Sequence, residues 1–95
     1  MRIIKEFVLR EIAGTCVLVP TGATTQEFNG MITINDTAKF FWQNIEKVNS
    51  FEELIEKLLE EYDVPREIAE RDMVATINVL MEKGIVDFTN EKENW

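Results

Sequence analysis

The first third of the chain alternates short apolar runs with turn-forming residues. Residues 7–12 and 15–19 are apolar or β-branched runs joined by Ala13-Gly14, which predicts a β-hairpin with a positive φ available at the glycine. Turn-forming and small residues interrupt the pattern over residues 20–25. The pattern resumes over residues 26–34, which predicts a third strand.

The third predicted strand has an apolar face and a more polar face, because successive side chains of a strand point to opposite sides. The apolar face carries Phe28, Ile32 and Ile34, and the other face carries Asn29, Met31 and Thr33. We expect the apolar face to point to the core. The strand runs straight into Asn35-Asp36, and either residue can cap the first helix.

The first predicted helix carries three aromatic residues in succession, and helical spacing places only two of them on its apolar stripe. The stripe comprises Ala38, Phe41, Trp42, Ile45 and Asn49. Phe40 falls outside it, either as a partly covered flank residue, which we favour, or as a binding hot spot.

The capping-box pair Ser50 and Glu53 predicts the start of a second helix. The apolar face of this helix comprises Leu54, Ile55, Leu58, Leu59 and Tyr62, and its glutamate-rich face is typical of a solvated surface. Pro65 suits the first turn of a third helix over residues 66–83, ending at Gly84. A short strand over residues 85–88 and a frayed tail over residues 89–95 complete the predicted single domain of residues 1–95.

The third predicted helix has no charged residue between Met73 and Met81. One row, which we expect to face the core, comprises Ala69, Met73, Thr76, Ile77 and Leu80; a second comprises Val74, Asn78 and Met81, and a third Ala75 and Val79. A helix uncharged on all sides is usually covered on more than one side. Either this is a central helix, or one of its rows is open and accepts a ligand chain.

The composition, 45% hydrophobic and 29% charged, is typical of a soluble globular domain. No apolar run is long enough to span a membrane, no signal peptide is evident, and the one cysteine, Cys16, fits a reducing cytoplasm. Residues 1–35 are neutral, so the net charge of −8 falls on residues 36–95. Nucleic acid is therefore a poor partner.

The sequence offers little for catalysis. It contains no histidine, no phosphate-binding glycine motif and no CxxC pair, and the adjacent carboxylates of the second helix point in different directions. We therefore expect neither an enzyme nor a bound metal or cofactor.

An ordered series of segments resembles the PqqD family of small peptide-binding domains, also called RiPP recognition elements. The segments are Asn35-Asp36-Thr37-Ala38 with Phe40-Phe41-Trp42, then Leu58-Leu59-Glu60-Glu61-Tyr62-Asp63-Val64, then Asp72-Met73 with Ile77, Leu80 and Gly84-Ile85-Val86. The resemblance extends from about Val8 to Phe88.

The resemblance implies an α+β, winged helix-turn-helix-like fold, with a three-stranded N-terminal antiparallel sheet followed by three helices. It also implies binding of the leader segment of a ribosomally made precursor peptide, presented to a modifying enzyme that is often of the radical SAM type. In the family the leader adds as a strand along the third strand, beside the third helix. The peptide-binding residues expected here are Asn29, Gly30, Met31, Ile32 and Thr33 on the strand, and Arg71, Val74, Asn78 and Met81 on the helix.

Two other functions have to be weighed against this one. A winged-helix DNA-binding regulator would share the architecture, yet the third helix has no net positive charge to favour a groove of DNA. A docking subunit of an enzyme complex would need no peptide on the sheet edge. An open edge strand also leaves room for a homodimer formed through the sheet.

Overall fold

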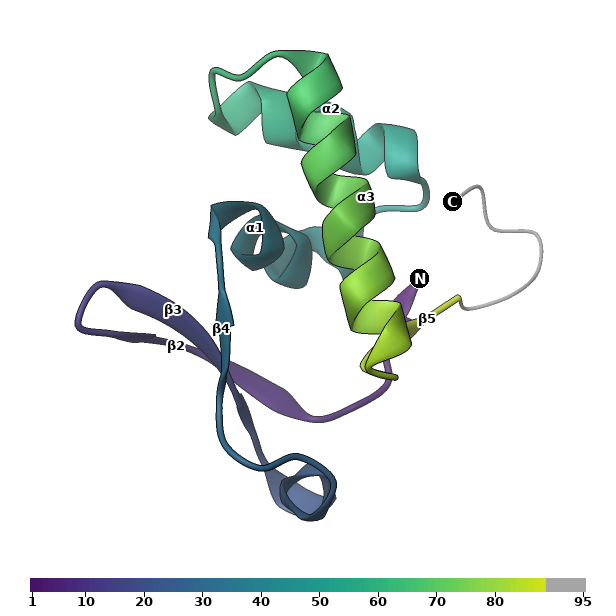
Figure 1. The fold of residues 1–95 in the computed structure, drawn as a ribbon. Helices are drawn as coiled ribbons and strands as arrows, with labels where there is room; N and C mark the ends of the chain where they lie inside the picture. The colour runs from purple at the N-terminus through teal and green to yellow at the C-terminus, as the bar shows by residue number, and fades with distance from the viewer. Residues whose placement is uncertain (89–95) are drawn as a thin grey trace.

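A computed structural model describes residues 1–88 of the 95-residue chain. It contains a three-stranded antiparallel sheet, three α-helices and a separate two-stranded sheet formed by the first and last strands of the described residues (Figure 1). The elements are β1 (Arg2–Ile3), β2 (Phe7–Ile12), β3 (Thr15–Pro20), the 3-10 helix η1 (Gly22–Gln26), β4 (Ile32–Ile34), α1 (Asp36–Asn44), the 3-10 turn η2 (Ile45–Lys47), α2 (Phe51–Glu61), α3 (Arg66–Glu82) and β5 (Val86–Asp87). The predicted α+β architecture is confirmed, whereas the predicted frayed tail lies outside the described residues.

The predicted hairpin is present as β2 and β3. Ala13 and Gly14 have φ values of 52° and 81°, the positive pair that suits a two-residue hairpin turn. The register pairs Ile12 with Thr15 next to the turn and Phe7 with Pro20 at the far end.

The third strand of the sheet, β4, is much shorter than the predicted residues 26–34. The preceding segment satisfies its backbone locally, because the carbonyl oxygen of Thr24 accepts hydrogen bonds from the backbone N–H groups of Glu27 and Phe28. The Thr24 hydroxyl also accepts a hydrogen bond from the Glu6 backbone N–H at 2.9 Å, which holds η1 against the start of β2. Only residues 32–34 pair with β3.

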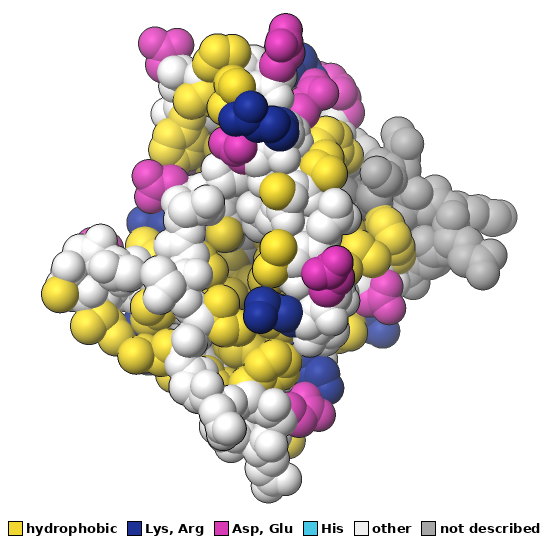
Figure 2. Space-filling view, viewed as in Figure 1, with side chains coloured by type: hydrophobic (Ala, Val, Ile, Leu, Met, Phe, Trp, Pro, Cys, Tyr) yellow, Lys and Arg dark blue, Asp and Glu magenta, His cyan; other side chains and the backbone are white. Residues whose placement is uncertain are grey.

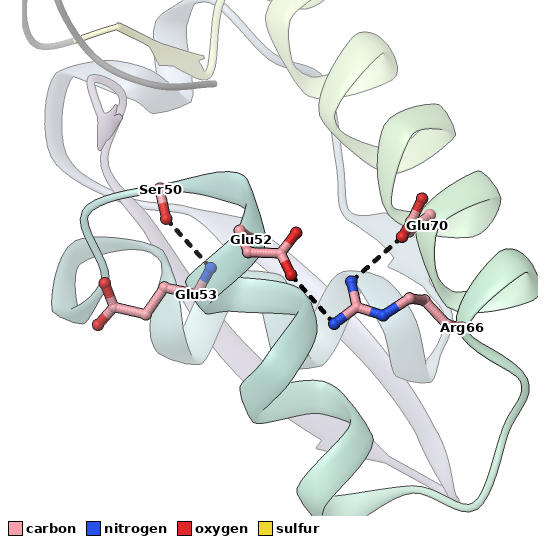
Figure 3. Close-up of polar contacts among 5 residues, drawn as sticks. All are labelled: Ser50, Glu52, Glu53, Arg66 and Glu70. Carbon is pink, nitrogen blue, oxygen red and sulfur yellow. Dashed lines mark hydrogen bonds and ion pairs between the residues drawn. The ribbon is translucent and has the colours of Figure 1, made fainter.

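Side-chain caps start both α1 and α2. Asn35, rather than Asp36, caps α1, and its Oδ1 accepts a hydrogen bond from the Ala38 N–H at 2.9 Å. Ser50 Oγ accepts from the Glu53 N–H at 3.1 Å, as the capping box predicts (Figure 3). The Glu53 carboxylate accepts in return from the backbone of Asn49, one residue earlier than in the standard box.

The expectation that Phe40 would be a partly covered flank residue is wrong, because its side chain is only 2% exposed. The α1 helix is covered on more than one side. Phe40 meets Tyr62 at the end of α2 edge to face, with ring centres 6.1 Å apart. Trp42 meets Phe7 of β2 at the same distance, also edge to face. Phe41 is fully buried in the core, so all three consecutive aromatics are packed against other parts of the chain.

The α3 helix crosses α1 and α2 and buries one face against them (Figure 1). The buried residues are Ala69, Met73, Ile77 and Leu80, as predicted, while Thr76 is only partly buried. Arg66 joins the start of α3 to the start of α2 through contacts with Glu70 (3.2 Å) and Glu52 (3.1 Å) (Figure 3). The hydrogen bond to Glu70, with the charge of Glu52, raises the pKa of Arg66.

The two ends of the described chain meet in a small antiparallel pairing. The predicted strand after α3 is confirmed as β5, and its partner is β1, with Arg2 opposite Asp87 and Ile3 opposite Val86. This partner was not predicted. No helix within residues 1–88 is long and apolar enough to cross a membrane.

Candidate functional site

The β4 strand lies at the edge of its sheet. The strand order is β2-β3-β4, so among the described strands β4 pairs only with β3. In an antiparallel pair, every second residue directs both its N–H and its C=O away from the partner. These outward groups form a template to which a further extended chain can add.

A groove runs between β4 and α3, next to this free edge. It has a volume of about 340 Å³, and hydrophobic side chains line the hollow between the two elements (Figure 2). The groove is lined by Ile32, Thr33, Ile34, Asn35 and Ala38 on one side and by Asp72, Ala75, Thr76, Val79 and Leu80 of α3 on the other. Ala75 and Thr76 have short side chains, which leaves the space open.

The two walls of the groove match in length. From Ile32 to Asn35 an extended chain advances about 10 Å, and from Asp72 to Val79 a helix also advances about 10 Å. This length accommodates about three residues of an extended peptide, at roughly 3.3 Å per residue. The arrangement suits a short strand whose alternate side chains point into an apolar groove.

Only part of the strand segment that was predicted to bind a peptide lines the groove. Ile32 and Thr33 line it. Asn29, Gly30 and Met31 precede β4 and do not line the groove; Gly30 has a φ of 83° and Met31 is 57% exposed. Their predicted contact with a peptide is not tested by this structure.

The helix residues predicted for binding lie on a different side of α3 from the groove. Arg71, Val74 and Asn78 are exposed, Met81 is partly buried against the core, and none of the four lines the groove. Val74 and Val79 are five residues apart, which places them about 140° apart around the helix axis. Whether these four residues contact a peptide stays a prediction.

Of the α3 residues that line the groove, Ala75 and Val79 formed the third uncharged row of the sequence, whereas Thr76 and Leu80 were expected to face the core. The one available signal was the small size of Ala75 and Thr76, which suits a position where another backbone approaches. The described residues contain no group of three or more His, Cys, Asp or Glu side chains that could hold a metal ion.

Comparison with known proteins agrees with this architecture. A solved structure described as "TbiB1 in Complex with the TbiA(beta) Leader Peptide" is similar over 96% of this chain and 100% of that chain, with a TM-score of 0.69 and 22% sequence identity. At this identity the similarity shows a shared fold. A search of curated proteins found no match.

A protein-family model described as "Coenzyme PQQ synthesis protein D (PqqD)" matches residues 15–86. The match begins at the first residue of β3 and ends within β5, so it includes β4, the three α-helices and both walls of the groove. The resemblance seen in the sequence is thus confirmed, and the chain belongs to the PqqD family.

Proposed function

We propose that this protein is a non-catalytic module that binds the leader segment of a ribosomally synthesised precursor peptide and presents the peptide to a modifying enzyme, of the radical SAM type. The leader adds as a strand to the free edge of β4 and places alternate side chains in the groove against α3. The modifying enzyme supplies the chemistry.

The free edge of β4, with an apolar groove directly beside it, is the observation that carries this proposal. Backbone hydrogen bonds give affinity with little dependence on sequence, whereas the groove selects side chains. Membership of the PqqD family and the fold shared with TbiB1, which was solved with a leader peptide, support the same function.

In this proposal the strand residues of the site are Ile32 and Thr33, and Asn29 to Met31 extend the pairing edge once the peptide is present. On α3 we add Ala75, Thr76 and Val79, which line the groove, to the row predicted from the sequence.

An NMR titration of the ¹⁵N-labelled protein tests the proposal. The ligand is the leader segment of a short candidate precursor peptide chosen from the neighbouring genes, and a scrambled peptide of the same composition is the control. We expect shifts at the backbone amides of residues 29–34 and along residues 72–80, with the hairpin turn at residues 12–15 unchanged. Undisturbed amides over residues 29–34 would exclude strand addition and favour a docking subunit.

A further inference from the structure

A second hollow opens where the groove ends at Asp72. This end pocket has a volume of about 170 Å³ and lies among the start of α1, the end of α2 and the start of α3. Its lining residues include the apolar Leu58, Tyr62, Val64 and Ile68 and the acidic Asp36 and Asp72. Asp72 also lines the groove, so the two hollows share a wall.

The apolar wall of the end pocket is open to solvent. Tyr62, Val64 and Ile68 are 37%, 39% and 36% exposed, and all three border the same hollow. Single exposed apolar residues are ordinary, but three around one cavity are not. A cavity of about 150 Å³ in another protein holds benzene, so this pocket has room for one large apolar side chain. The contact between Tyr62 and Phe40 holds the aromatic ring in place.

The two acidic residues Asp36 and Asp72 place negative charge at the end pocket. Asp36 lies in the first turn of α1, and the Asp72 side chain is 44% exposed. Arg71 Nε lies 3.6 Å from Asp72 Oδ1, but the Arg71 side chain is 72% exposed and this contact between neighbouring residues is weak. A cationic side chain placed beside the pocket would therefore be attracted by two acidic residues and repelled by one exposed arginine, Arg71.

We propose that the end pocket is a second subsite of the peptide site, taking a large apolar side chain while an adjacent Lys or Arg of the same peptide pairs with Asp36 and Asp72. This inference rests on the proposed function. It adds a requirement that strand pairing does not impose: the bound peptide must carry a basic residue next to an apolar one. The groove is about 10 Å long, so this pair lies about three residues from the peptide position opposite Ile32.

Selection from a display library of random 15-residue peptides tests the subsite independently of the leader's own sequence. The library is panned on the full chain and on the double variant Asp36→Asn/Asp72→Asn. The matched control is Glu56→Gln/Glu60→Gln, which removes the same charge from exposed positions on α2. Thermal unfolding checks that each variant is folded.

We expect the native chain to enrich peptides that carry Lys or Arg beside a large apolar residue. The Asp36→Asn/Asp72→Asn variant should lose the preference for the basic residue and keep the apolar one. The best native peptide should bind this variant about tenfold more weakly, and with less dependence on salt, while the control changes by less than about twofold. Val64→Ser should weaken binding about fivefold at every salt concentration.

The outcomes separate the subsite from the proposed function. One result would overturn the subsite and leave leader binding intact: the enriched peptides shift the amides of residues 29–34 but show no preference for Lys or Arg. These peptides would also bind the Asp36→Asn/Asp72→Asn variant as tightly as the native chain. Failure of the native chain to enrich any peptide would overturn both.

Discussion

The α3 helix has two uncharged flanks that resemble each other in composition and differ in their surroundings. The groove flank is formed by Ala75, Thr76 and Val79, and the outer flank by Val74, Asn78 and Met81. Val74 and Val79 are each 47% exposed, so the valine of one flank presents as much apolar surface as the valine of the other. The groove flank lies beside a strand with an open edge, and it borders a hollow of about 340 Å³.

The difference shows why exposure of apolar residues does not by itself define a binding site. A peptide loses hydrogen bonds to water when it leaves solvent, and an apolar helix surface cannot replace them. The edge of β4 offers N–H and C=O groups that can. A helix flank becomes selective for an extended peptide when such an edge runs beside it.

The largest expected effect is the loss of stability when a residue on the buried face of α3, between the two flanks, is replaced. Met73 is fully buried, so Met73→Ala should lower the free energy of unfolding by about 3 kcal/mol. Val74→Ala and Val79→Ala should each change it by less than about 1 kcal/mol. Urea denaturation of the three variants measures this. A large loss in either valine variant would show that the flank belongs to the core.

A matched pair of substitutions on the two flanks should have the next largest effect. Val79→Glu places a carboxylate in the groove near Asp72 and should weaken leader binding about 30-fold. Val74→Glu adds the same charge at an equally exposed position and should change binding by less than about twofold. Isothermal titration calorimetry compares the two. The reverse order would place the peptide on the outer flank, where the sequence-based interpretation put it.

The smallest expected effect concerns the helix cap at one end of the groove. Asn35→Ala removes the acceptor of the Ala38 N–H and should cost about 1 kcal/mol of stability. Because Asn35 lines the groove, we also expect binding to weaken about twofold to threefold. Ser50→Ala removes the corresponding cap of α2, away from the groove, and is the control. Ser50→Ala should lower stability by a similar amount and leave leader binding unchanged. If both variants weaken binding equally, the loss of binding comes from lower stability and not from the groove.

The features that the sequence determined are those set by neighbouring residues. Ala13-Gly14 specified the hairpin turn, Asn35-Asp36 and Ser50 specified the starts of α1 and α2 to within one residue, and Gly84 follows the end of α3 closely. These depend on backbone conformation and on hydrogen bonds between residues at most a few positions apart. The repeat of apolar residues also identified the buried face of α3.

The features that only the tertiary structure decided depend on distant segments. Phe40 is buried in the core, where distant residues including Tyr62 pack against it, and β5 has a partner because it pairs with β1 from the other end of the described chain. The segment before β4 does not continue the strand, because Thr24 accepts hydrogen bonds from the backbone N–H groups of Glu27 and Phe28 and, through its hydroxyl, from that of Glu6. The position of the site depended on how far α3 is rotated about its own axis. The sequence allowed either the row of Val74, Asn78 and Met81 or the row of Ala75 and Val79 to be open, and it placed Thr76 on the core-facing row. Packing of α1 and α2 against the buried face fixes that rotation, and it turns Ala75, Thr76 and Val79 toward β4.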